Sequence, residues 1–159
     1  MRRMLWILCF LIVIVLFGNC LPGNNIKYPA GKDTIESFGD GTYQISSGSN
    51  ESLFNEEYGS CIMQQVSEFY ETEKKVYIIG ITTQEFFVDE AKVERSYKMY
   101  AVLELQNNTM TLCPIPADQS YPEVYIYRLN EMIDNCDIAL VSDLSAFSDE
   151  DFLTFQEIE

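Results

Sequence analysis

One short stretch, residues 76–81, constrains the fold of this chain more than any other. It reads Val-Tyr-Ile-Ile-Gly-Ile, and nearly all of its residues are apolar and either β-branched or aromatic. Such a run is typical of a strand buried on both faces, because a strand with one solvated face alternates apolar and polar residues. We therefore expect Lys75–Thr82 to be the central strand of a sheet, covered on both sides for part of its length.

The preceding segment, residues 61–70, fits two patterns. Its apolar residues have the i, i+4, i+7, i+8 spacing of one helix face. The polar residues Glu71–Lys74, however, connect it directly to the central strand, which is typical of a hairpin turn. We predict a strand over 61–70 and keep the helix as the alternative.

A second hairpin is predicted over residues 97–115. Two β-rich runs, 97–105 and 109–115, flank Gln106-Asn107-Asn108, and Asn tolerates the positive φ that a tight turn requires. Alternate residues of the first run are apolar and form the expected core face: Tyr97, Met99, Ala101, Leu103 and Leu105. The prolines of the second run, Pro114 and Pro116, are expected to end it.

Three other segments between residues 42 and 96 are interpreted from their composition. Residues 42–46 follow an Asp-Gly turn and predict a short strand. Residues 46–60 are rich in Ser, Asn and Glu and predict a surface loop, and residues 83–96 predict a charged excursion from the sheet.

The C-terminal part predicts two helices. Ser120 and Glu123 form a capping box for the first, and Ser148, followed by three acidic residues, marks the start of the second. Four apolar residues are expected on its buried side: Phe152, Leu153, Phe155 and Ile158. Between the helices, Ile138–Val141 is either a short edge strand or a buried turn.

The sum of these elements is an α+β fold. We expect an antiparallel meander of four to five strands with two C-terminal helices on one face, preceded by an N-terminal apolar leader or anchor helix. Residues 1–20 are expected to be a signal peptide or membrane anchor. Residues 21–41 contain several Pro and Gly residues and are expected to be a tether, and residues 42–159 are expected to form a single domain. A weaker alternative has the second half of the tether packing on the domain.

The leader indicates location. Two arginines precede thirteen apolar residues, Leu5–Phe17, and Cys20 follows closely. Three readings stay open: a lipoprotein leader with lipid on Cys20, an uncleaved anchor, or ordinary cleavage after Cys20. In the first two the rest of the chain lies outside the cytoplasm, in the cell envelope, because the arginines stay inside.

Composition excludes several classes of function. The formal net charge of −15 argues against nucleic acid and against anionic lipid as partners. The chain contains no histidine, which excludes Ser-His-Asp and Cys-His catalysis and histidine metal sites. Cys61, Cys113 and Cys136 have no zinc-site spacing, although one disulfide among them is chemically allowed. We expect no cofactor and no metal.

Charge segregation is the strongest indication of a binding function. Residues 33–73 and 129–159 each contain nine acidic residues and no Lys or Arg. If both segments share one surface, it would attract a basic protein. The candidate partner-binding residues combine these acids with tyrosines, which are enriched at interfaces: Glu56, Glu57, Tyr121, Tyr125, Glu150 and Asp151.

Two functions from different classes are consistent with these patterns. The first is a membrane-tethered, non-catalytic binding or protective module for a basic protein, such as an immunity-type inhibitor of a toxin, in the bacterial cell envelope. The second is a carboxylate-dependent enzyme or enzyme subunit acting on envelope polysaccharide, using Glu56, Glu57, Glu68, Glu71 or Glu73. Acidic residues that do nothing but keep the protein soluble are an equally common cause of such charge.

Overall fold

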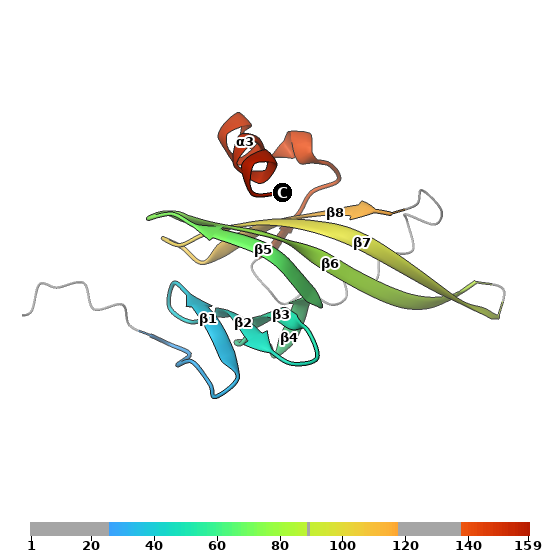
Figure 1. Ribbon diagram of the computed structural model, residues 1–159, viewed down its shortest axis with the longest axis horizontal. Helices are drawn as coiled ribbons and strands as arrows, with labels where there is room; N and C mark the ends of the chain where they lie inside the picture. Colours follow the sequence, from blue (N-terminus) through green and yellow to red (C-terminus); the bar gives the residue numbers. More distant parts are fainter. Residues whose placement is uncertain (1–25, 89, 118–137) are drawn as a thin grey trace, which may run out of the picture.

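The computed structural model describes residues 26–88, 90–117 and 138–159. These residues form two β-sheets and a C-terminal α-helix, which lie in three layers (Figure 1). The mixed, sheet-rich fold agrees with the α+β prediction, but the strands form two sheets where a single meander was expected. The predicted leader helix and the helix predicted to begin at Ser120 lie outside the described residues.

The first sheet is a four-stranded antiparallel meander. Its strands are β1 (Thr34–Phe38), β2 (Tyr43–Ser47), β3 (Glu51–Asn55) and β4 (Ser60–Met63), in that order. The prediction of a loop over residues 46–60 is therefore wrong in its centre, because Leu53 is fully buried opposite Ile45. Strand β1 also lies within the segment assigned to the tether, and Phe38 is buried, so folded structure begins before residue 42.

The second sheet contains the predicted central strand. Its order is β5 (Gln65–Glu71), β6 (Lys75–Val88), β7 (Ala91–Glu104), β8 (Thr109–Pro116) and β9 (Ile138–Leu140). All neighbours are antiparallel except β9, which runs parallel to β8. The hairpin predicted over 97–115 is confirmed, although β8 continues through Pro114 to Pro116. Of the two alternatives for Ile138–Val141, the structure has the short edge strand.

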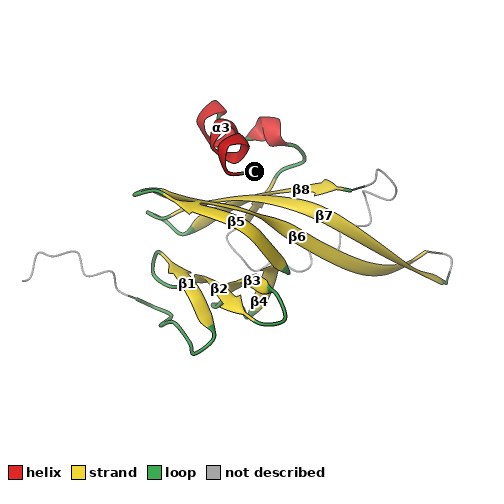
Figure 2. Cartoon of the chain, in the orientation of Figure 1, coloured by secondary structure: helices red, strands yellow, loops and turns green. Residues whose placement is uncertain are grey.

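Residues 76–80 of β6 are covered on both faces, as the composition of this segment predicts. Val76 and Ile78 are buried between the two sheets, together with the predicted core face of β7. Tyr77 and Ile79 point to the other face, where they pack against Phe155 of the helix α3 (Asp149–Ile158). The first sheet and α3 therefore lie on opposite sides of the second sheet (Figure 2).

The chain passes from the first sheet to the second at Gln64, and Gly80 makes this crossing possible. A Cβ atom at Gly80 would lie 2.2 Å from the Gln65 carbonyl oxygen and 2.2 Å from the Met63 sulfur. Only glycine lets β6 approach the crossing chain this closely. Residues 61–70 are thus extended, as predicted, but they belong to two strands of different sheets.

Strands β6 and β7 extend beyond their neighbours as a two-stranded arm. The first residue of β5, Gln65, pairs with Ile81, and the last residue of β8, Pro116, pairs with Tyr97. Residues 84–88 and 91–95 pair only with each other within the described ranges. The charged excursion predicted over 83–96 is therefore strand, and its charges form cross-strand ion pairs such as Lys92–Glu85 at 2.7 Å.

Helix α3 begins where the sequence predicts. The Ser148 hydroxyl accepts a hydrogen bond from the Asp151 N–H at 3.2 Å, which caps the helix, and a short 3-10 turn (Leu144–Ala146) precedes it. The predicted buried side is only partly right. Phe155 is buried, but Phe152 and Leu153 are 37% and 57% exposed, because the helix rests on the sheet through Asp151 and Phe155.

Candidate functional site

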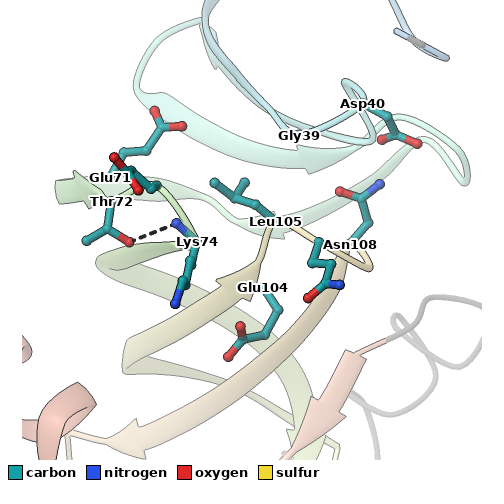
Figure 3. A pocket seen from close by; sticks show the side chains of 10 residues that line it. Gly39, Asp40, Glu71, Thr72, Lys74, Glu104, Leu105 and Asn108 are labelled. Carbon is teal, nitrogen blue, oxygen red and sulfur yellow. Dashed lines mark hydrogen bonds between the residues drawn. The ribbon is translucent and has the colours of Figure 1, made fainter. Parts of the chain in front are cut away.

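Three turns meet at the end of the molecule opposite the arm and enclose a hollow of about 820 Å³ (Figure 3). They connect β1 to β2, β5 to β6, and β7 to β8. We call this surface the turn hollow. It is lined by Gly39, Asp40, Glu71, Thr72, Glu73, Lys74, Glu104, Leu105, Gln106 and Asn108.

The β5–β6 turn is closed by a threonine. The Thr72 hydroxyl accepts hydrogen bonds from the N–H groups of Lys74 at 3.3 Å and Lys75 at 2.9 Å, while the Thr72 N–H donates to the Lys75 carbonyl at 2.8 Å. The Leu105 N–H then donates to the Lys74 carbonyl at 2.8 Å, which joins this turn to the β7–β8 turn. A backbone hydrogen bond therefore connects the β5–β6 and β7–β8 turns, which form two of the three walls of the turn hollow.

The β7–β8 turn uses the predicted asparagines. Asn107 accepts hydrogen bonds on its Oδ1 from the N–H and the hydroxyl of Thr109, at 3.3 and 2.8 Å. Asn108 has φ +54°, a left-handed conformation that Asn adopts more readily than most residues. The two asparagines therefore form the tight turn that the sequence predicts between β7 and β8.

The β1–β2 turn forms the third wall. Asp40 lies between two positive-φ glycines, and its Oδ1 accepts hydrogen bonds from the Thr42 N–H at 3.0 Å and the Thr42 hydroxyl at 2.6 Å. The segment that precedes β1 is also bound to this turn, since the Lys27 N–H donates a hydrogen bond to the Asp40 carbonyl at 2.8 Å. A Cβ at Gly41 would lie 1.9 Å from the Tyr28 carbonyl oxygen, so glycine is required for this approach.

The charge of the turn hollow is strongly negative. Four of its lining residues carry carboxylates, namely Asp40, Glu71, Glu73 and Glu104, against the single lysine Lys74. Glu104 also lies 3.2 Å from Lys75, just outside the lining. An open concave surface with this balance attracts cationic groups and repels phosphates and other anions.

The sequence-predicted site residues are not brought together. Glu56 and Glu57 lie in the β3–β4 turn, where Glu57 contacts Lys27 at 2.9 Å. Glu150 is exposed on α3, on the opposite side of the second sheet. The single acidic face that would join these residues does not form from them, and Tyr121, Tyr125 and Cys20 lie outside the described residues.

Asp151 was predicted to lie on a binding surface, but its side chain is buried and hydrogen-bonded within the protein. It is 6% exposed, and its carboxylate accepts hydrogen bonds from Lys75 at 2.8 Å, Tyr77 at 2.9 Å and Ser148 at 2.7 Å. Burial opposes its charge, but these three donors outweigh it and hold the pKa of Asp151 below its ordinary value. Burial and the neighbouring Asp151 carboxylate raise the pKa of Tyr77 to about 12, so the phenol remains a donor at neutral pH.

The other groups that could carry chemistry in the described residues are the thiols of two cysteines and the remaining acidic side chains. Cys61 and Cys113 are free thiols there, and burial, with a smaller effect of Asp143, raises the pKa of Cys113 to about 11. A protonated thiol is a weak nucleophile. Within residues 26–88, 90–117 and 138–159, no group of three or more acidic or cysteine side chains is placed to hold a metal ion.

Sequence reasoning missed Asp40 and Glu104 as members of an acidic site. They lie in two turns far apart in the sequence, and each turn alone has an ordinary polar composition. The one feature of the sequence that could have indicated this site is that acidic residues stand beside the predicted turns.

Comparison with known proteins identifies no relative, since no protein-family model, no curated protein and no solved structure matches this chain. In the part of the chain that the structure describes, no helix has the length and apolar character needed to cross a membrane.

Proposed function

We propose that this protein is a non-enzymatic binding or protective module for a basic protein partner, tethered to the membrane and displayed on the outer side of it in the bacterial cell envelope. An immunity-type inhibitor of a toxin fits this description. The observation that carries the proposal is the turn hollow, an open concave surface lined by four carboxylates and one lysine.

The shape and charge of the hollow favour a protein partner over a small substrate. Its walls are turns, so a protruding loop with Lys or Arg side chains can enter from solvent. Complementary charge of this kind raises the rate of association and selects against acidic partners. The alternative, a carboxylate enzyme acting on polysaccharide, needs two carboxylates at fixed separation around a bound substrate.

The test is an interaction screen against basic secreted and envelope proteins, followed by association rates across a salt series. Glu71→Gln combined with Glu73→Gln should lower the association rate and weaken its salt dependence. Glu51→Gln combined with Glu150→Gln removes two exposed charges elsewhere and serves as the matched control. The free energy of unfolding should be unchanged in both.

Three outcomes would overturn the binding proposal. The first is a partner that is acidic, and the second is an association rate that does not change with salt concentration. The third is an equal effect of both double variants on the association rate. Hydrolysis of an envelope polysaccharide that disappears with Glu71→Gln would instead establish the enzymatic alternative.

Membrane attachment through residues 1–20 is tested separately by fractionation. The full-length protein should be found with membranes, and Cys20→Ala should release it or abolish lipid labelling if Cys20 is lipidated. Unchanged attachment in Cys20→Ala would favour a plain anchor, and a protein found free in the cytoplasm would contradict the leader interpretation.

A further inference from the structure

Strand β5 lies at the edge of the second sheet. It pairs with β6 on one side, and no strand lies on its other side within residues 26–88, 90–117 and 138–159. All seven of its residues except Val66 are exposed. An unpaired row of N–H and C=O groups is a template on which another chain can add a strand. The outer edge of β5 is therefore a candidate surface for such an addition.

The turn after β5 shows which backbone groups face outward. The Thr72 N–H donates a hydrogen bond to the Lys75 carbonyl, so the backbone of Thr72 faces β6. Because facing and non-facing residues alternate along an antiparallel pair, the N–H and C=O groups of Phe69 and Glu71 face away from β6. A shift of register interrupts the ladder just before residue 68. The regular part of the open edge is therefore residues 68–71.

Each face of this edge presents one aromatic ring and one carboxylate. Glu68 and Tyr70 are on the face that carries α3, and Phe69 and Glu71 are on the face toward the first sheet. The side chains of Phe69 and Tyr70 are 38% and 50% exposed, so both rings keep free apolar surface. The Phe69 ring also packs edge-on against Phe38, with 5.8 Å between the ring centroids, which holds it at the edge.

The two glutamates decide which kind of strand this edge accepts. Glu68 and Glu71 are both exposed, and the ion pairs found in the described part of the chain use other carboxylates. A second copy of this chain would bring further carboxylates to the same edge, and each copy has a net charge of −15, so repulsion opposes self-pairing. A strand with Lys or Arg side chains has the complementary charge.

We propose that the basic partner binds by strand addition to β5. An extended segment of the partner places a basic, two apolar and a second basic side chain opposite residues 68–71. Cross-strand pairs of opposite charge and of aromatic with aliphatic side chains stabilise such a pairing, and main-chain hydrogen bonds supply affinity. This mode of recognition rests on the proposed function. It connects to the turn hollow, because β5 ends at Glu71 in the wall of the hollow.

The first test uses the full-length chain in detergent and three synthetic peptides. Acetyl-Thr-Lys-Val-Val-Lys-Thr-amide has the complementary pattern, and acetyl-Thr-Val-Lys-Lys-Val-Thr-amide has the same composition and charge in another order. The third peptide is the first one with both valine nitrogens methylated, which blocks main-chain pairing. NMR titration should show shifts of the Phe69 and Glu71 amides with the first peptide, and its affinity should exceed that of the other two by about tenfold or more.

A pair of variants separates the backbone edge from the side chain. Phe69→Pro and Phe69→Ala both remove the aromatic ring, but only proline also removes the outward N–H, which an edge strand can lose without breaking its own ladder. Phe69→Pro should bind the first peptide, and the basic partner found by the interaction screen, about fivefold or more weakly than Phe69→Ala. Denaturant unfolding checks that both variants are folded.

Strand addition is overturned if the first peptide does not shift the β5 amides, if either comparison peptide binds as tightly, or if the two Phe69 variants bind alike. A basic partner that loses its salt-dependent association when Glu71→Gln and Glu73→Gln are combined, but binds both Phe69 variants equally, would support the proposed function and overturn strand addition. The expected peptide results without any basic partner in the screen would support the β5 edge as a binding site and overturn the proposed function.

Discussion

The ammonium group of Lys75, the first residue of β6, lies 2.8 Å from the carboxylate of Asp151 in the first turn of α3. These residues are 76 positions apart in the sequence. With Tyr77 donating to the same carboxylate oxygen, the pair fixes the N-terminal end of the helix on the second sheet. At the other end, Glu159 pairs with Lys98 and accepts a hydrogen bond from Tyr100 at 3.2 Å.

Removing the Asp151 charge should loosen α3. Asp151→Asn leaves Lys75 without its closest partner and should lower the free energy of unfolding by about 1–3 kcal/mol, as expected when a buried charged hydrogen bond is broken. Asp149→Asn, at an exposed position of the same turn, is the control. Denaturant unfolding measures both, and equal effects would show that the pair does not hold the helix.

The same pair predicts a loss of stability in acid. The pKa of Asp151 in the folded protein lies below its ordinary value of 3.8. Its contribution is therefore complete above pH 3.8 and is lost as the pH falls through the lower, folded-state value. Unfolding measured from about pH 2 to 6 should show this loss, and Asp151→Asn should lack that component. An unchanged profile in the variant would assign the acid sensitivity to other carboxylates.

Gly80 should tolerate no side chain. Gly80→Ala places a Cβ 2.2 Å from the Gln65 carbonyl oxygen and the Met63 sulfur, so the backbone must shift where the chain crosses between sheets. We expect a loss of about 1–3 kcal/mol in the free energy of unfolding. Gly48→Ala is the control, since its nearest contact would be 3.5 Å. A stable Gly80→Ala protein would mean that the crossing is looser than described.

Ile79 tests the central position of β6. It is 3% exposed, and Ile79→Asp would bury an unpaired charge beneath α3, which should lower the free energy of unfolding by more than about 4 kcal/mol. Ile26→Asp, at an isoleucine that is 63% exposed, should have little effect. Circular dichroism and thermal unfolding compare the two, and a well-folded Ile79→Asp protein would contradict the central placement.

Local patterns predicted the elements that depend on neighbouring residues. The apolar run of β6, the asparagine turn before β8 and the Ser148 cap each contain their own signal, and each appears in the structure. Strand β3 and the arm were missed because polar and charged residues interrupt their apolar ones. Their strand conformation depends on partners: Leu53 opposite Ile45, and Glu85 beside Lys92.

The candidate site was less predictable than the fold, because it depends on how three turns meet. The charge count correctly indicated a strongly acidic protein, but it could not show which acids share a surface. Asp151 illustrates the difference, since its sequence context matches that of Glu150 while its side chain is buried among donors.

The strand order also has a consequence for how the chain folds. Within each sheet, consecutive strands through β8 pair with each other, so most of the β structure can assemble from adjacent hairpins without closing long loops. Topologies dominated by such local contacts fold fast. The parallel β9 and α3 join distant parts of the chain, so we expect them to dock after the hairpins have formed, with the Asp151–Lys75 ion pair among the last contacts to form.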